Sequence, residues 1–228
     1  MTGDLGDTGE PGEYTLFRDL VAPLKIPLYV IPGNHDGSAL WTAFPDLAAR
    51  RPAEGLGYVA EVGPLRLIMF DSTLPGQHHG AATPERCDWF AAALAEGGDR
   101  PALLFLHHPP FVTGIGHMDH GLCNDAAGLT EMVAKSDTLL AIGCGHIHRT
   151  ITSAIGGTAA IVAPSTAHAV RFDLGDNAPP GFDLEPPGFL LHRIVQTETG
   201  WTHVVHTSFI GAYPGPFPFA DAGEGLSG

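Results

Sequence analysis

The chain of 228 residues has few cysteines, few basic residues and no long apolar run. Its three cysteines, Cys87, Cys123 and Cys144, are too scattered for a disulfide framework and lack C-x-x-C spacing. This usage favours a reducing compartment, so we expect a cytoplasmic protein. No run of about 18 apolar residues is present, and the first residues show no signal-peptide pattern. We therefore expect no membrane partner.

Positive charge is scarce, with 11 basic against 25 acidic residues and a formal net charge of −14. This balance disfavours a broad contact with the phosphate backbone of DNA or RNA, so we expect no nucleic-acid polymer as a partner. An anionic substrate would need local positive charge, and bound metal ions are an obvious source. The signatures H-E-x-x-H and G-x-S-x-G are also absent, which disfavours zincin and serine-hydrolase chemistry.

Histidine, by contrast, is abundant, with 13 residues. Side chains of metal-ligand type follow, or could follow, apolar strand-like segments in four places: Gly3-Asp4, Gly33-Asn34-His35-Asp36, His107-His108-Pro109-Pro110 and Gly145-His146-Ile147-His148. Taken alone, Pro-Gly-Asn after a strand is ordinary turn chemistry. Four such strand ends in one chain are hard to attribute to chance.

In the last two of these groups, the spacing of the histidines indicates which side chains point to the same side of the chain. In an extended segment, residues i and i+2 point to the same side, so His146 and His148 can face one cavity while Ile147 points away. His107 could be a ligand or a structural hydrogen-bonding residue. The adjacent His108 is expected to point to the opposite face and to donate a supporting hydrogen bond.

The donor types narrow the choice of metal. Asp4 offers a carboxylate, Asn34 an amide oxygen, and His107 and His146 offer imidazoles. This mixture suits Mn²⁺, Fe or Zn²⁺ and differs from the thiolate sets of structural zinc sites.

The wider pattern is that of an α/β protein. The segment 169–187 is acidic and proline-rich and is predicted to be a long loop, and 211–219 is predicted to be an aromatic arm that lies on a partner or on its own domain. The tail after Ala220 is predicted to be mobile.

Helices are expected over 13–24, 38–47 and 83–94, with Thr83 as the cap of the third, and a further helix is expected after a cap at Asn124. Strands are expected over 28–31, 58–62, 65–70, 102–106, 139–142, 151–155, 158–162, 188–196 and 202–208.

The order Gly-Asp, Gly-Asn-His-Asp, His-His-Pro-Pro and Gly-His-Ile-His resembles the calcineurin-like metallophosphoesterase superfamily, and within it the branch of cyclic-nucleotide phosphodiesterases and bacterial glycerophosphodiesterases. The resemblance covers nearly the whole chain. It implies an α/β fold, a four-layer α/β/β/α sandwich missing its first strand and helix, over residues 1–210. Residues 211–228 would form a C-terminal arm and tail. The resemblance also implies dimers or higher assemblies of the chain.

Carried over residue by residue, the resemblance implies a dinuclear centre. Asp4 would bridge both metals, and Asn34, His107 and His146 would complete one of them. His148 would bind the other.

The same resemblance implies roles in catalysis and substrate binding for three further residues. His35 would contact the substrate phosphate or protonate the leaving alkoxide, and Asp36 would orient it. His168 matches a position that contacts the substrate phosphate.

One departure from the family pattern limits this expectation. The family opens with an Asp-x-His motif that supplies two metal ligands, and no such motif precedes Asp4. We therefore expect one well-held metal ion and a second that is weak or absent. The sequence predicts metal-dependent hydrolysis of a small phosphodiester, of cyclic-nucleotide or glycerophosphodiester type. The alternative is a metal-binding fragment or scaffold with little or no activity.

Overall fold

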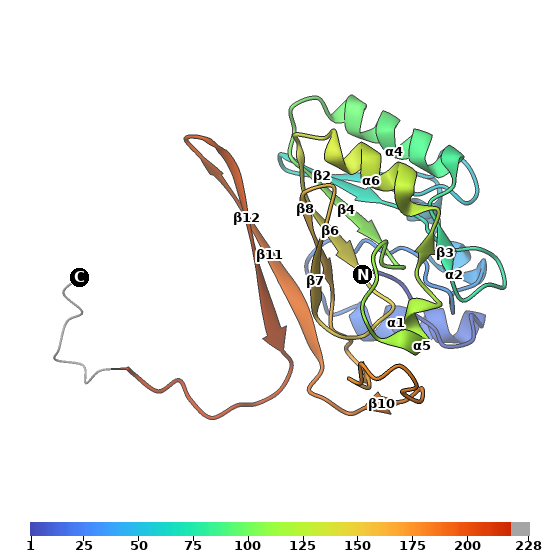
Figure 1. Cartoon of the computed structure of the whole chain (residues 1–228), viewed down its shortest axis with the longest axis vertical. Coiled ribbons are helices and arrows are strands. Elements are labelled where there is room, and N and C mark those ends of the chain that lie inside the picture. The colour runs from blue at the N-terminus through green and yellow to red at the C-terminus, as the bar shows by residue number, and fades with distance from the viewer. Residues whose placement is uncertain (220–228) are drawn as a thin grey trace.

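A computed structural model describes residues 1–219, and its centre is a mixed six-stranded sheet (Figure 1). The strands are β1 (Tyr58–Val62), β2 (Leu65–Met69), β4 (Ala102–Leu106), β6 (Leu139–Cys144), β7 (Ile151–Ile155) and β8 (Thr158–Val162). They lie in the order β1-β2-β4-β6-β8-β7, in which β2, β4, β6 and β8 are mutually parallel and the two edge strands are antiparallel to their neighbours. Loops that follow the parallel strands therefore gather at one edge of the sheet, where ligands commonly bind in α/β proteins.

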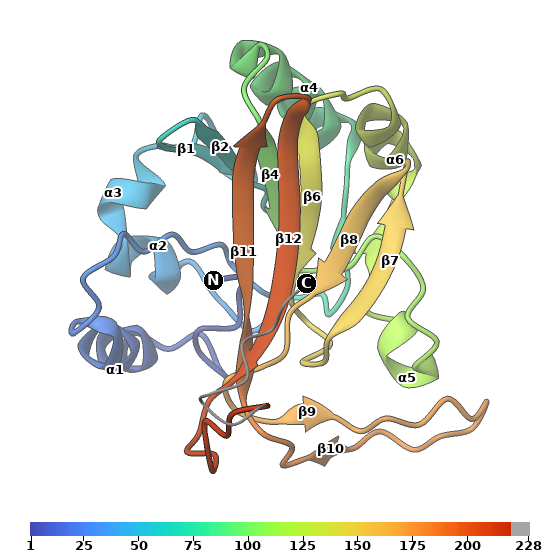
Figure 2. The same ribbon diagram turned by 90° about the vertical axis from the view of Figure 1, so that its left-hand side faces the viewer.

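Different elements cover the two faces of this sheet. Helices α4 (Pro84–Gly97) and α6 (Ala126–Ala134) cover one face. A long hairpin of β11 (Gly188–Thr197) and β12 (Gly200–Phe209) crosses the other face in front of β4 and β6 (Figure 2). Among residues 1–219, no helix covers the outer side of this hairpin (Figure 1). The predicted α/β class is confirmed, and three of the four predicted layers are present in the described chain.

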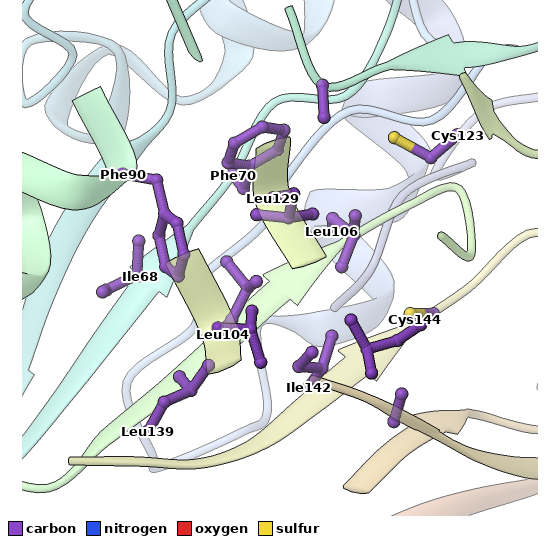
Figure 3. Close-up of a cluster of buried hydrophobic side chains, with 14 of the residues drawn as sticks. Ile68, Phe70, Phe90, Leu104, Leu106, Cys123, Leu129, Leu139, Ile142 and Cys144 are labelled. Atoms are coloured by element: carbon purple, nitrogen blue, oxygen red, sulfur yellow. The ribbon is translucent and has the colours of Figure 1, made fainter. Parts of the chain in front are cut away.

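The alternation of side chains along β4 divides the interior into two sides. Leu104 and Leu106 are fully buried with Phe90 of α4 and Leu129 of α6 (Figure 3). Phe105 points to the other face, where its ring meets that of His192 edge-on at 5.9 Å between centroids. Burial of each large apolar side chain stabilises the fold by about 1.5–3 kcal/mol. Packing on both faces of the sheet therefore holds β4 in place, and with it the loop that begins at its carboxyl end.

The smaller elements surround this framework. Helices α1 (Pro11–Val21) and α2 (Ala39–Ala43) pack on each other, and a second buried cluster joins Tyr14, Leu40 and Tyr58. The predicted loop 169–187 carries a two-residue ladder of β9 (Ala169–Val170) with β10 (Phe182–Asp183). The remaining short elements are α3 (Pro45–Ala48), α5 (Gly116–Asp119), β3 (Gly80–Ala81) and β5 (Cys123–Asn124).

Three predicted elements differ from the structure. The helix expected over 38–47 is divided into α2 and α3 at Phe44, because Pro45 disfavours helical dihedrals in the residue before it. The segment 28–31 is not a strand, since its backbone partner is Met1 alone, through bonds at Tyr29 and Ile31. Asp125, and not Asn124, precedes α6 as its N-cap residue.

Apolar side chains are exposed at the C-terminal end of the described chain. Tyr213 and Phe217 of the predicted arm are 58% and 76% exposed. The part of the predicted mobile tail from 220 to 228 lies outside the described residues. Within 1–219, none of the helices combines the length and the apolar character needed to cross a membrane.

Candidate functional site

Four loops bring their polar residues together at the carboxyl edge of the central sheet. His107 follows β4 directly, and His146 follows β6 after one glycine. Asp4 comes from the N-terminal segment and Asn34 from the loop before α2. A side chain on Gly33 would collide with the carboxylate of Asp4, so the approach of these two segments requires glycine there.

His107 is the buried centre of this group, with 1% of its surface exposed. Its Nδ1 donates a hydrogen bond of 2.6 Å to the carbonyl oxygen of Thr2. Because a carbonyl can only accept, Nδ1 carries a proton, so Nε2 is the atom that can offer a lone pair to a metal ion.

Three further electron-pair donors surround that lone pair. The carboxylate Oδ2 of Asp4 lies 3.2 Å from His107 Nε2, the amide Oδ1 of Asn34 lies at 3.1 Å, and Nδ1 of His146 lies at 3.2 Å. Such atoms repel one another unless a proton on His107 Nε2 or a metal cation lies among them. The arrangement therefore fits a bound divalent ion, and its carboxylate, amide and imidazole donors suit Mn²⁺, Fe or Zn²⁺.

Burial lowers the pKa of His107, but the hydrogen bond and charge of Asp4 outweigh it and raise the net pKa, so a bound metal ion would displace a proton from Nε2. Two other ligands already have the protonation state that binds metal. Burial lowers the pKa of His146 to about 3, and the charge of His107 adds to this shift. Burial raises the pKa of Asp4, but the hydrogen bond and charge of His107 outweigh it, so the net pKa lies well below its usual range. At neutral pH His146 is therefore neutral and Asp4 is ionised.

The loop after β6 presents its two histidines in an unexpected conformation. His146 and His148 have φ values of 69° and 56°, so they lie in the left-handed region rather than in the predicted extended segment. Ile147 points away, as predicted, and is fully buried in the main core. His148 Nδ1 is buried and has no hydrogen-bond partner among residues 1–219.

The predicted orientation of His108 is wrong. Its ring is fully buried and lies against those of His107 and His146, with centroids 4.7 and 4.9 Å apart. Ligand-type atoms of these three histidines all lie within 4.8 Å of one another. The sequence argument failed because the peptide turns directly after β4, so strand alternation does not extend to His108. Its Nδ1 lies 2.8 Å from the Oγ of buried Ser72.

His35 lies on the accessible rim of this centre. Its backbone amide donates to Oδ1 of Asp4 at 3.0 Å, and its side chain is 43% exposed. Its Nδ1 lies 2.8 Å from the carbonyl oxygen of Asp7 and 3.7 Å from the Asp7 carboxylate. Sequence reasoning missed Asp7. The available signal was a second carboxylate three residues after Asp4 in the same turn-rich loop.

Asp36 contacts the loops rather than the ring of His35. Its carboxylate accepts hydrogen bonds from the amides of Leu5, Gly6 and Gly33, at 2.9–3.3 Å, and from the hydroxyl of Tyr14 at 3.1 Å. Burial is the main cause that raises the pKa of Asp36. Any influence of Asp36 on His35 is therefore exerted through the backbone that both share.

His168 lies next to His148, at 4.7 Å between ring centroids. Both residues line a cavity of about 200 Å³, which also contains Arg149 and Glu185. The structure thus brings Asp4, Asn34, His107 and His146 together, with His35 on the rim of the group and His148 and His168 beside a neighbouring cavity.

A family model for calcineurin-like phosphoesterases matches residues 1–150. The chain belongs to this family. A probable glycerophosphodiester phosphodiesterase GpdQ of Arcobacter nitrofigilis is 39% identical, over 96% of this chain and 80% of the relative. The 3',5'-cyclic adenosine monophosphate phosphodiesterase CpdA of Escherichia coli K12 is 30% identical, over 86% of this chain and 74% of the relative.

A solved structure supports the same fold. The chain superposes on GAP50, the anchor in the inner membrane complex of Plasmodium, with a TM-score of 0.52 over 94% of this chain and 75% of that one. The sequence identity is 11%, so this likeness concerns the fold alone.

Proposed function

We propose that the chain hydrolyses small phosphodiesters at the centre formed by Asp4, Asn34, His107 and His146. The observation that carries this proposal is the convergence of four electron-pair donors beside an exposed histidine, His35. The resemblance to GpdQ and CpdA phosphodiesterases supports diesters as the substrate class, of glycerophosphodiester or cyclic-nucleotide type.

The chain's own residues divide the chemistry between them. When bound, a divalent ion would supply positive charge for the phosphate oxygens and lower the pKa of water toward about 7. Asp4, Asn34, His107 and His146 would hold that ion. With its Nδ1 proton donated to the carbonyl of Asp7, the doubly protonated ring of His35 would give its Nε2 proton to the leaving alkoxide and become neutral.

We propose one well-held metal ion per chain. The described residues contain a single group of three or more close His, Cys, Asp or Glu donors, formed by His107, His108 and His146. It shares two residues with the proposed centre, and His148 is outside both. Calorimetric titration of metal-stripped protein with Mn²⁺ is expected to give one strong site. Two strong sites of equal affinity would contradict this stoichiometry.

The test of activity uses bis(p-nitrophenyl) phosphate and metal-stripped protein. Added Mn²⁺ is expected to restore turnover. With a glycerophosphodiester, whose alkoxide leaving group needs a proton, His35→Ala is expected to lower kcat by about 10²–10⁴-fold with an unchanged metal content. His206→Ala is the control, because His206 is exposed on β12, far along the chain from these loops. Hydrolysis of the glycerophosphodiester that is unaffected by His35→Ala would refute the assigned role.

A second candidate function is metal binding without turnover. It is favoured by His148, whose buried Nδ1 has no partner within 1–219 and which lies outside the three-histidine group. Tight binding of Mn²⁺ with no release of p-nitrophenolate would support this alternative.

A further inference from the structure

The cavity beside His148 has walls from three parts of the chain. The loop after β6 contributes Arg149, the loop after β8 contributes His168, and the base of the β11–β12 hairpin contributes Glu185 and Phe209. His148 also lines the cavity, and it lies two residues after His146 of the candidate centre and close enough for its charge to affect the pKa of His146. We call this cavity the side pocket.

The side pocket is small. Its volume of about 200 Å³ is below the ~300–1,000 Å³ of typical ligand sites and corresponds to about seven water molecules. It therefore has room for one short arm of a diester, and a nucleoside arm would exceed it.

The positive charge in its wall is already neutralised. Both terminal nitrogens of Arg149 donate to Oε1 of Glu185, at 2.8 and 2.6 Å, and one of them also donates to the carbonyl of Val170 at 2.9 Å. The Arg149 side chain is only 16% exposed. It is thus held in place and offers little to an incoming anion.

The Glu185 carboxylate, by contrast, keeps a free acceptor. Its side chain is 46% exposed, and its Oε2 accepts no hydrogen bond from residues 1–219. The pocket wall therefore combines the apolar surfaces of Pro164, Pro186 and Phe209 with this accessible carboxylate oxygen and with the polar side chains of Thr150, Ser165 and His168.

Resting on the proposed phosphodiesterase function, we propose that the side pocket binds one ester arm of the substrate and that Glu185 selects a small alcohol whose free end donates hydrogen bonds, such as an amino alcohol. The carboxylate oxygen would accept the donated hydrogen bond, and the apolar walls would contact the short carbon chain. An anionic arm would find no free positive charge there, and Glu185 is a specificity-determining residue in this proposal.

The test compares two isosteric chromogenic diesters in the presence of Mn²⁺. They are 2-aminoethyl 4-nitrophenyl phosphate and propyl 4-nitrophenyl phosphate, which share the leaving group and differ by an ammonium in place of a methyl. The wild-type kcat/KM is expected to favour the aminoethyl ester by about tenfold or more. In Glu185→Gln this ratio should fall to about one or lower, because the accepting carboxylate oxygen is lost while the shape is kept and Arg149 is left without its ion-pair partner.

Glu198→Gln, in the exposed turn between β11 and β12, is the matched control and should keep the wild-type ratio. A wild-type ratio near one, or a ratio unchanged in Glu185→Gln, would overturn the side-pocket proposal. Equal hydrolysis of the thymidine 5' ester of 4-nitrophenyl phosphate would also overturn it, because that arm exceeds the pocket.

Binding separates this proposal from the proposed function. If no aryl diester is hydrolysed, the phosphodiesterase proposal fails, and calorimetry with O-phosphoethanolamine and propyl phosphate still tests the pocket. Tighter binding of O-phosphoethanolamine that is lost in Glu185→Gln supports the side pocket, and equal affinities overturn it.

Discussion

At the scale of single residues, the backbone contributes more than side-chain charge to the placement of His35. The Asp7 carboxylate is 90% exposed and 3.7 Å away, whereas the Asp7 carbonyl is 2.8 Å from His35 Nδ1. An exposed ion pair contributes about 0–1 kcal/mol, so we expect Asp7→Asn to lower kcat less than about fivefold. Steady-state kinetics with bis(p-nitrophenyl) phosphate measure this. A hundredfold loss would instead identify the carboxylate as the important contact.

A substitution at Gly33 tests the metal centre without replacing any of the proposed ligand residues. In Gly33→Ala, the added methyl would collide with the Asp4 carboxylate and lie 2.6 Å from its backbone nitrogen, so Asp4 must move. We expect affinity for Mn²⁺ to fall by about 10–100-fold, as when supporting contacts of a metal site are lost. Gly12→Ala is the control, because no atom lies within 4 Å of its added methyl. Equal Mn²⁺ affinities in calorimetry would contradict the placement of Asp4.

The sequence predicted the ligand types but not their supports. Asp4, Asn34, His107 and His146 were expected together because each follows, or could follow, an apolar strand-like segment and because the family resemblance implies this ligand set. The structure brings them together. The partner of His107 Nδ1 is the carbonyl of Thr2. Backbone atoms are the same in every residue type, so no sequence pattern reveals which carbonyl will lie there.

At the scale of elements, the sequence predicted helices and strands best where the residues that stabilise them are near in the sequence. Thr83 caps α4 as predicted, through a bond from the Arg86 amide to its hydroxyl, and β1 and β2 form the predicted hairpin. The segment 28–31 has the composition of a strand, yet a strand requires neighbours with paired backbones. The sequence of 28–31 alone does not contain that information.

The β11–β12 hairpin carries a titratable pair on the side that faces the sheet. His192 Nδ1 lies 2.9 Å from His203 Nε2, and the His192 ring packs on Phe105. Burial, and then the charge of His203, lowers the pKa of His192 to about 4. Burial also lowers the pKa of His203. The folded hairpin therefore favours two neutral rings.

This pair predicts a loss of stability in acid. Unfolded histidine titrates near pH 6.5, so between about pH 6.5 and 4 the unfolded chain binds more protons than the folded one. The stabilisation is complete above pH 6.5 and falls as the pH drops toward 4. Between pH 7 and 5, we expect the Tm of the wild type to fall about 3 °C further than that of His192→Asn, which cannot titrate. Equal Tm slopes in circular dichroism would refute this.

At the scale of the whole molecule, exposed apolar surface and net charge have opposite effects on association. The outer side of the hairpin exposes Phe189, Leu191 and Val204, which are 40–55% exposed, and the arm exposes Tyr213 and Phe217. Within 1–219, β11 and β12 pair only with each other, so each has a free edge. Apolar patches and free edges of this kind mark interaction surfaces. The net charge of −14 opposes contact between copies until salt screens it.

We therefore predict that the chain self-associates through the hairpin and the arm. Light scattering in 0.3 M NaCl is expected to give at least twice the mass of one chain, with a lower mass at 0.02 M NaCl. Truncation before Gly211 and, separately, Leu191→Glu should each shift the mass toward one chain, whereas Leu16→Glu, on the exposed face of α1, should not. A single-chain mass for the wild type at about 100 µM would contradict the prediction. A mass unchanged by both hairpin and arm variants would place the contact on another surface.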